Sequence, residues 1–428
     1  MVSYSKFIEQ SFLIYGLGLS GQSVVKFFKK NNIKNYKVWD DNKINLFKNK
    51  RVVNLNNTLN QVDYIILSPG ISLNNSKNKK KLIKFKKKII TDIDLLYLIN
   101  KNFKSIVVTG TNGKSTTCKL ITHLLKKNKF KVVFGGNIGT PILDLKIKKN
   151  CYVIIEASSF QLSHSKFICP DYAFLLNITN DHLDWHGNIK NYTNAKFKIF
   201  GLQKKNQTAI INNKFKEIFK KKKFLSKLII PKTKIYKEIK YKIKNFYLKS
   251  IINDENMSHA YTFSKLLKIS QKNFIKSMKS FVGLSHRYEF FLKRKNIIFI
   301  NDSKATTFEA TKYALSSNKN IYWILGGLPK ENDKIVLKEV KKNIVKCYLI
   351  GNNINFFKEQ IKNKINFSVS KNLKDSIIKI LGDIKLFNKK NNTILLSPAA
   401  ASYDQFTNFE KRGDEFKKLC KIYAKKYL

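Results

Sequence analysis

The stretch that decides the fold of the middle of the chain is Ser105–Thr117, which reads Ser-Ile-Val-Val-Thr-Gly-Thr-Asn-Gly-Lys-Ser-Thr-Thr. Its β-branched run predicts a short buried strand, and residues 114–127 place leucine and isoleucine on one face of a helix. A glycine-rich loop joins the two. Strand, glycine loop and amphipathic helix in this order are typical of a site that binds the phosphates of ATP or GTP.

The loop has the residue types that a polyphosphate requires. Its glycines let backbone N–H groups approach the phosphates, Lys114 adds positive charge, and a hydroxyl at the start of the helix is available to magnesium. Val108 stands where the full pattern has a glycine. The residues expected around ATP are Gly110, Thr111, Asn112, Gly113, Lys114, Ser115 and Thr116.

Charge is the most unusual feature of the composition. The 428 residues include 83 Lys and Arg against 28 Asp and Glu, a formal net charge of +55. Such an excess is typical of proteins that bind nucleic acid or anionic membranes. However, arginine occurs only at positions 51, 287, 294 and 412, and the lysines are scattered along the chain. We interpret the charge as solvated lysine faces and expect no nucleic-acid partner.

The cysteines and the apolar runs indicate in which cellular compartment the protein is expected. Five cysteines, at positions 118, 151, 169, 347 and 420, show no paired spacing, which argues against a disulfide framework. The N-terminus has no charged-then-apolar signal pattern, and no apolar run approaches the ~18 residues of a membrane span. We expect a cytoplasmic protein without stable membrane insertion.

A second glycine-rich turn opens the chain. Residues 12–15 predict a strand that runs into Gly16–Gly21, Gly-Leu-Gly-Leu-Ser-Gly, and a helical pattern follows. The next predicted strand ends at Asp40, and another, residues 64–67, runs into Ser68-Pro69-Gly70-Ile71. This arrangement is typical of a nucleotide-binding domain. Because the glycine loop at residues 110–113, which we call the cradle, lies so close along the chain, we expect residues 16–21 to bind a different ligand. We place the end of this domain near residue 92.

Polar residues follow the next predicted strands. Residues 152–155 end in Glu156, where a magnesium ligand is expected, although this acid is alternatively a helix cap. Residues 172–176 are followed within eleven positions by Asn177, Asn180, Asp181, His182, Asp184 and His186, a density that favours a metal or substrate site. Residues 192–200 predict a helix with Lys196 and Lys198, which in so lysine-rich a chain are ordinarily surface charges.

The last third of the chain predicts another α/β domain. Its predicted strands, residues 297–300, 321–325, 347–350 and 393–396, each run into small or polar residues, with helical patterns between them. Ligands are therefore expected at the carboxyl edge of a mostly parallel sheet. We predict three α/β domains: a Rossmann-like domain at 1–92, a P-loop domain at 93–284 and a Rossmann-like domain at 285–428.

Taken together, these segments resemble the Mur ligase family, which builds the peptide stem of cell-wall precursors. The motifs that carry the resemblance are residues 16–21, 68–71, 110–116, 180–184, 301–306 and 402–410. Residues 16–21 and the Asp-Gln-Phe sequence at 404–406 are most similar to the members that add D-glutamate. The resemblance implies an ATP-dependent ligase that joins D-glutamate to UDP-N-acetylmuramoyl-L-alanine through an acyl phosphate.

The resemblance also implies which residues meet each substrate. In the first domain, Gly18, Leu19, Ser20, Ser68 and Gly70 would hold the uridine diphosphate, and Asn137 and His182 would meet the muramoyl-alanine part. Family members often have an arginine after the acid of the second strand, whereas Asp41 and Asn42 follow Asp40 here. D-Glutamate would lie against Lys304, Thr306, Lys330, Ser402 and Phe409, and Leu328 replaces a familiar aspartate near Lys330.

For ATP, the resemblance implies two magnesium ions. Ser115 and Glu156 would hold one ion, and His182 with a carbamylated Lys196 the other, because a lysine ammonium has no lone pair. Lys114, His182 and Lys196 are thus the expected catalytic residues. Asn256, Arg287 and Asp302 match positions that hold adenine, phosphate and ribose, and His259 stands where an asparagine is usual.

Other functions stay open at this point. Within the same chemistry, the chain is alternatively another Mur-type ligase or a folylpolyglutamate-type ligase. Two functions of other classes also stay open. The net positive charge suggests a nucleic-acid-binding P-loop ATPase, and the glycine turn at residues 16–21 suggests a Rossmann oxidoreductase. We expect a monomer whose partners are small-molecule substrates.

Overall fold

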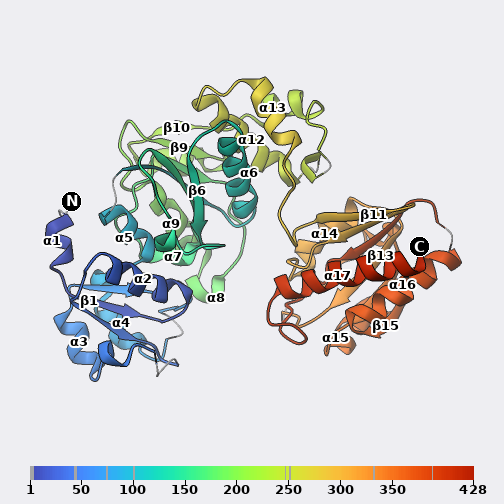
Figure 1. Ribbon diagram of the computed structural model, residues 1–428, viewed down its shortest axis with the longest axis horizontal. Helices are drawn as coiled ribbons and strands as arrows, with labels where there is room; N and C mark the ends of the chain where they lie inside the picture. The colour runs from blue at the N-terminus through green and yellow to red at the C-terminus, as the bar shows by residue number, and fades with distance from the viewer. Residues whose placement is uncertain are drawn as a thin grey trace. The chain divides into compact units, whose positions relative to one another are not determined.

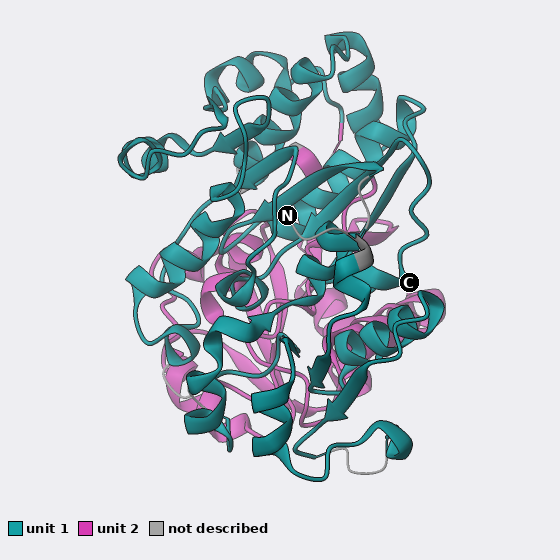
Figure 2. Cartoon of the chain, turned by 90° about the vertical axis from the view of Figure 1, so that its left-hand side faces the viewer, with its two compact units in different colours: residues 1–244, 253–281 teal, residues 245–252, 282–428 magenta. Residues whose placement is uncertain are grey.

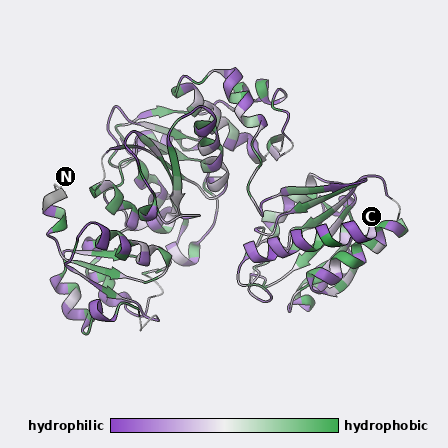
Figure 3. Ribbon diagram, viewed as in Figure 1, coloured by the Kyte–Doolittle hydropathy of each residue, from purple (hydrophilic) through white to green (hydrophobic). Residues whose placement is uncertain are grey.

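Apolar runs form the strands of three separate sheets, and amphipathic segments between them form the helices (Figure 1). The computed structural model describes residues 4–42, 46–73, 76–99, 102–245, 247–249, 252–330, 333–387 and 389–428. Hydropathy follows this arrangement, with the apolar residues concentrated in the strands (Figure 3). In the part of the chain that the structure describes, no helix is both long enough and apolar enough to cross a membrane.

The chain forms two compact units, residues 1–244 with 253–281 and residues 245–252 with 282–428 (Figure 2). The first unit contains two sheets and the second unit contains one. Each sheet lies within one of the three predicted domains, so the predicted α/β class is confirmed. The exact boundaries at residues 92 and 284 stay predictions.

The first sheet has the strand order β2-β1-β3-β4, and all of its pairs are parallel. Its strands are β1 (Phe12–Tyr15), β2 (Tyr36–Trp39), β3 (Tyr64–Leu67) and β4 (Ile89–Ile90), and its helices are α1 (Tyr4–Ile8), α2 (Leu19–Lys30), α3 (Leu55–Gln61), α4 (Lys79–Lys84) and α5 (Asp92–Ile99). Helices α2 and α5 contribute to one apolar core, while α3 and α4 contribute to another. The sheet is therefore covered by helices on both faces.

The second sheet has the order β10-β9-β8-β5-β7-β6 and is also parallel throughout. Its strands are β5 (Phe103–Thr109), β6 (Val132–Gly136), β7 (Cys151–Glu156), β8 (Tyr172–Leu175), β9 (Thr208–Ile211) and β10 (Lys227–Ile229). Its helices are α6 (Lys114–Lys127), α7 (Ser159–His164), α8 (Leu183–His186), α9 (Ile189–Phe197), α10 (Lys216–Lys221), α11 (Thr233–Lys240), α12 (Ile252–Leu266) and α13 (Gln271–Lys279). Strand β5, which leads into the cradle, lies between β7 and β8, so its carboxyl end has strand ends on both sides.

The third sheet has the order β11-β12-β16-β13-β14-β15. Its strands are β11 (Glu289–Arg294), β12 (Ile297–Asn301), β13 (Ile321–Gly326), β14 (Ile344–Ile350), β15 (Phe367–Lys371) and β16 (Asn392–Leu396), and its helices are α14 (Phe308–Ser316), α15 (Ile354–Ile361), α16 (Leu373–Phe387) and α17 (Phe409–Tyr427). Helices α14 and α15 cover one face, while α16 and α17 cover the other.

The sequence predicted four of these six strands and missed the two at the edges. Edge strand β11 pairs antiparallel with β12, and its residues are partly buried or exposed. Edge strand β15 is mostly exposed or half-buried. Neither strand has the continuous apolar run of the central strands, because an edge strand is covered on fewer sides.

Candidate active site

The predicted cradle forms at the carboxyl end of β5. The helix α6 begins at Lys114, directly after Gly113, which is left-handed with φ +81°. A Cβ atom at Gly113 would lie 2.2 Å from Oδ1 of Asn256, a residue of α12, so only glycine fits this close approach. Ser115 and Thr116 are buried in the first turn of α6. The sequence thus folds into the strand, loop and helix that it predicts.

Two lysines meet at the first glycine of the loop. Lys114 donates from Nζ to the carbonyl oxygens of Gly110, at 2.9 Å, and Thr111, at 2.8 Å. Lys196, on α9, donates to the same Gly110 oxygen at 2.8 Å and lies over the ring of Tyr192. The Lys196 side chain is only 1% exposed, and burial, aided by the charge of Lys114, holds its pKa well below the ordinary value. Lys196 is therefore no surface charge but a buried amine that is readily neutral.

Glu156 ends β7, in register with Val108 of β5. Its Oε1 accepts a hydrogen bond from Nδ2 of Asn137 at 3.2 Å, and its backbone oxygen accepts from the N–H of Asn137 at 2.9 Å. Among the described residues, Oε2 is buried and has no hydrogen-bond partner. An orphaned carboxylate oxygen is a suitable ligand for a hard cation such as Mg²⁺. The alternative interpretation of Glu156 as a helix cap is wrong, because Ser158 caps α7.

His182 lies at the start of α8 in a left-handed conformation, with φ 52°. Its ring packs on Phe160, with 4.7 Å between ring centroids, and Nε2 lies 3.4 Å from Oδ2 of Asp181. The neighbouring His186 is buried, and burial lowers its pKa to about 4. Over the described ranges, no three His, Cys, Asp or Glu side chains are grouped to hold a metal ion. The expected magnesium ligands also include Ser115 and Lys196, so the magnesium sites stay a prediction.

A cavity of about 420 Å³ lies in the first unit, and residues of the glycine turn at 16–21 and of the glycine-rich segment at 136–141 line it. Of the residues predicted to hold the UDP substrate, Gly18, Leu19, Ser20, Ser68, Gly70 and Asn137 line it, and His182 does not. Gln161, Pro141, Gly136 and Gly139 also line it and were missed by sequence reasoning. The signal for Gly136, Gly139 and Pro141 is the Gly-Gly-Asn-Ile-Gly-Thr-Pro sequence at residues 135–141, whereas Gln161 lies on α7.

Two acids after β2 line the same cavity but are held differently. Asp40 accepts the backbone N–H groups of Leu17 and Asn42. The Oδ1 atom of Asp41 accepts from three side chains: Trp39 Nε1 at 2.9 Å, Tyr15 OH at 3.1 Å and Asn78 Nδ2 at 3.1 Å. Asp40 thus shapes the turn, whereas Asp41 is a carboxylate fixed at the cavity wall.

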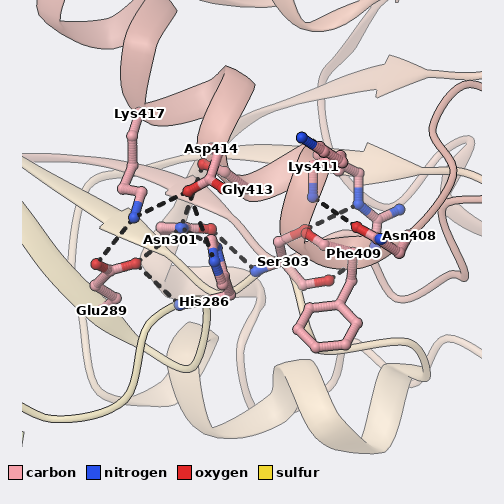
Figure 4. A network of polar contacts seen from close by, with 11 residues as sticks. His286, Glu289, Asn301, Ser303, Asn408, Phe409, Lys411, Gly413, Asp414 and Lys417 are labelled. Carbon is pink, nitrogen blue, oxygen red and sulfur yellow. Dashed lines mark hydrogen bonds and ion pairs between the residues drawn. The ribbon is translucent and has the colours of Figure 1, made fainter. Parts of the chain in front are cut away.

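In the second unit, the expected amino-acid and ribose residues gather at the carboxyl edge of the sheet. Lys304 lies over the ring of Phe409, with Nζ 4.6 Å from the centroid, and Ser303 donates from its hydroxyl to the backbone oxygen of Phe409 at 2.8 Å. A bridge between Leu328 and Ala401 brings the end of β13 beside buried Ser402. Figure 4 shows His286, Asn301 and Ser303 facing the start of α17. Thr306 is half-buried and Lys330 is exposed near this edge.

Arg412 is a residue of this edge that the sequence reasoning listed only as one of four arginines. It is 1% exposed, although its guanidinium is charged. Its Nε donates to Ser303 Oγ at 3.0 Å, and Nη2 donates to the backbone oxygens of Ser303 and Ala400. Arg412 thus ties the loops after β12 and β16 together. The sequence feature that could have indicated Arg412 is its residue type, because arginine is rare in this lysine-rich chain.

Asn256 and His259 lie on α12, as the helical spacing predicted. Asn256 is buried, and its Oδ1 accepts from the hydroxyl of Thr117 at 3.2 Å. His259 is 1% exposed, and its Nδ1 lies 2.9 Å from the backbone oxygen of Glu255. Burial lowers the pKa of His259, so its ring is a neutral part of the core beside Phe174.

Asp302 generates a prediction for the pH dependence of stability. Its carboxyl accepts the N–H of Tyr288 and the hydroxyl of Ser397, and burial raises its pKa from 3.8 to about 7. Between these values the folded chain keeps a proton that the unfolded chain has released, so the free energy of unfolding falls as pH rises. We expect Asp302→Asn, which cannot ionise, to gain at least about 3 °C in Tm relative to the unchanged chain between pH 4 and pH 8.

Differential scanning calorimetry across this pH range measures the difference. Ser402→Ala, a buried change at the same edge without a titrating group, is the control and should shift Tm by the same amount at each pH. A difference between Asp302→Asn and the unchanged chain that is constant with pH would contradict the prediction.

Comparison with known proteins identifies the family. A family model of the Mur ligase middle domain matches residues 108–285, and a model of the Mur ligase MurD-like N-terminal domain matches residues 10–90. The UDP-N-acetylmuramoylalanine–D-glutamate ligase of Wolbachia sp. subsp. Brugia malayi is 36% identical over 490 residues, covering 98% of this chain and 97% of that protein. The enzyme of the same name from Rickettsia felis is 37% identical over 445 residues, covering 96% and 97%.

Solved structures agree on the fold. The MurF ligase of Thermotoga maritima in complex with ADP matches with a TM-score of 0.58 at 16% identity, covering 99% of this chain and 100% of that chain. The UDP-N-acetylmuramate–alanine ligase MurC of Thermotoga maritima matches with a TM-score of 0.57 at 16% identity, covering 98% and 100%. The resemblance drawn from the sequence motifs is confirmed, and this chain belongs to the Mur ligase family.

Proposed function

We propose that this chain is the ATP-dependent ligase that adds D-glutamate to UDP-N-acetylmuramoyl-L-alanine in the synthesis of peptidoglycan precursors. The observation that carries the proposal is the match, over nearly the whole chain, to relatives named as D-glutamate ligases. We infer that ATP binds at the glycine loop after β5 and that the UDP part of the other substrate binds in the cavity beside residues 16–21. The free cysteines fit a reducing compartment, and we infer a monomeric cytoplasmic enzyme.

The reaction needs two bond exchanges. The alanyl carboxylate oxygen attacks the γ-phosphorus of ATP, the bond to the β,γ-bridging oxygen breaks, and ADP leaves. The amine of D-glutamate then attacks the acyl carbon, loses a proton, and inorganic phosphate leaves. The first step brings two anions together, so positive charge and positioning are what the protein must provide.

Residues of the cradle suit this task. We infer that Lys114, which now donates to the loop carbonyls, turns to the β- and γ-phosphates when ATP is bound, and that Gly110–Gly113 present backbone N–H groups. In the second unit, Arg287 and Asp302 are proposed for phosphate and ribose. Lys304, Thr306, Lys330, Ser402 and Phe409 are proposed for D-glutamate, whose two carboxylates suit the lysines.

Magnesium fits the residues present. Glu156 keeps a buried oxygen without a hydrogen bond in the described structure, and Ser115 lies in the first turn of α6. We propose that these two hold one ion, and that His182 and a carbamylated Lys196 hold a second. Bound magnesium would offset the negative charge between the carboxylate and the triphosphate.

Lys196 is suited to carbamylation by its environment. A neutral amine attacks carbon dioxide, the new N–C bond forms, and a proton is released to leave an N-carboxylate. Burial and Lys114 favour the neutral amine in the resting chain. The anion that results would in turn be stabilised by the nearby Lys114 charge.

The amino-acid preference tests the function as a whole. With UDP-N-acetylmuramoyl-L-alanine and ATP, we expect release of ADP and phosphate to depend on D-glutamate, with L-glutamate and diamino acids at least ~100-fold less effective. A coupled assay of ADP measures this. Preference for a diamino acid or a folate substrate would favour a sister ligase, and hydrolysis stimulated by duplex or stem-loop RNA would favour the nucleic-acid-binding ATPase.

Lys196→Ala tests the carbamate. We expect kcat to fall about 100-fold or more, because a charged ligand near the phosphates is lost. Incubation of the unchanged chain with ¹³C-bicarbonate should add a carbamate carbon signal to its NMR spectrum, and the variant should lack it. Lys190→Ala, at an exposed position of the same helix, is the matched control. Full activity of Lys196→Ala with and without bicarbonate would refute the role.

Asp41 is our proposal for the nucleoside contact, in place of the arginine usual in the family. Its carboxylate is fixed by Trp39, Tyr15 and Asn78 at the cavity wall, and the uracil N3–H and the ribose hydroxyls are donors that it can accept. We expect Asp41→Asn to raise KM for the UDP substrate roughly tenfold, since its NH2 group cannot accept. KM for ATP should stay unchanged, and exposed Glu9→Gln serves as the control. An unchanged KM for the UDP substrate would exclude Asp41.

A further inference from the structure

Glu255, in the first turn of α12, lies against the ends of two strands of the central sheet. Its Oε1 accepts a hydrogen bond from Nδ2 of Asn212, which follows β9, at 2.6 Å. Its Oε2 accepts from Nδ2 of Asn177, which follows β8, at 2.9 Å. The side chain is half-buried. Each carboxylate oxygen thus meets the NH2 group of one asparagine.

Asn177 carries this contact on to the cradle. Its Oδ1 accepts the backbone N–H of Asn112 at 2.8 Å, and its backbone oxygen accepts the N–H of Thr111 at 2.8 Å. Because a carboxylate only accepts hydrogen bonds, Glu255 requires the NH2 group of Asn177 to face it. The Oδ1 atom of Asn177 must then face the loop. The Nδ2 atom of Asn177 also donates to the backbone oxygen of Asn112 at 3.3 Å, so Glu255 and the loop backbone together fix which way the Asn177 amide points.

The next residue of α12 holds the other end of the loop. Asn256 accepts from the hydroxyl of Thr117 at 3.2 Å and lies where a Cβ atom at Gly113 would be. Glu255 thus acts on the loop before Gly113 through Asn177, while Asn256 lies against Gly113 and contacts Thr117 of α6. The start of α12 therefore restricts the conformation of the loop at residues 110–113.

A carboxylate close to a site for triphosphate is unfavourable unless it has a separate task, because like charges repel. Both oxygens of Glu255 are already directed at asparagine amides, so direct contact with ATP does not explain the residue. We propose that Glu255 is a positioning residue for the nucleotide: through Asn177 it holds the Thr111–Asn112 backbone in the shape that receives the phosphates. This inference rests on the proposed ATP-dependent function and assigns a role to a residue that the sequence motifs leave out.

Glu255→Gln is the first test. The NH2 group of glutamine would face the NH2 group of one asparagine, so the Asn177 amide would be held by its two hydrogen bonds with Asn112 and less firmly by α12, and the loop shape would be less tightly fixed. We expect the Kd for ADP, measured by calorimetry on the full chain, and KM for ATP to rise roughly tenfold. KM for D-glutamate should change less than about twofold, which a general loss of structure would not produce. Exposed Glu238→Gln, in the same unit, is the matched control.

A second variant separates positioning from folding. Asn177→Asp alone turns a second carboxylate toward Glu255, and we expect it to weaken ADP binding by more than about tenfold. Adding Glu255→Gln to Asn177→Asp restores a donor opposite an acceptor, and the new carboxylate at position 177 still has an oxygen that accepts the Asn112 N–H. We expect the double variant to bind ADP at least about fivefold more tightly than Asn177→Asp.

Three results would overturn the positioning role of Glu255. Equal loss of affinity for all substrates together with a lower Tm in Glu255→Gln would overturn the proposal, as would unchanged ADP binding. A double variant weaker than both single variants would also overturn it. If D-glutamate does not drive ADP release but ADP still binds and responds to Glu255 as described, the proposed amino-acid function fails while the positioning role stands.

Discussion

Lys114 and Lys196 donate to a single carbonyl oxygen, that of Gly110, and the chemistry of the site depends on this shared acceptor. Burial disfavours the charged form of the inner lysine, and repulsion from the other ammonium group at the same oxygen adds to this cost. Lys196 is the inner one, and its pKa is held low, while Lys114 lies at the start of α6. One lysine is thus suited to hold phosphate and the other to react as a neutral amine. The two roles differ because of surroundings, since the side chains are identical.

Acids near the two nucleotide sites follow a common rule. Asp41 is held by an indole, a phenol and an amide, and Glu255 by two amides. Donors of this kind stabilise a carboxylate without neutralising it, so the acids shape sites that must accept anionic ligands. Glu156 is different, because one of its buried oxygens has no hydrogen-bond partner in the described structure. For this reason Glu156 is the acid that we propose as a magnesium ligand.

Much of the fold was accessible from local pattern. The helix α6 has the bounds that its apolar face predicted, and the central strands appeared as β-branched runs. Edge strands β11 and β15 were missed because partial exposure dilutes their pattern. Glu255 and Arg412 were missed as site residues for another reason: their partners lie 78 and 109 positions away along the chain. No window of sequence contains both members of such a pair.

The sequence by itself determined where the glycine loop between β5 and α6 forms, because glycine, lysine and hydroxyl residues at fixed spacing dictate local backbone shape and charge. It also determined the family, through motifs spread over the whole length. Only the tertiary structure decided which of the many lysines is buried with a lowered pKa, which carboxylates accept hydrogen bonds from amides, and which oxygen of Glu156 has no hydrogen-bond partner among the described residues. These properties depend on desolvation and on contacts between distant segments, and both arise only when parallel strands bring their carboxyl ends to one edge of a sheet.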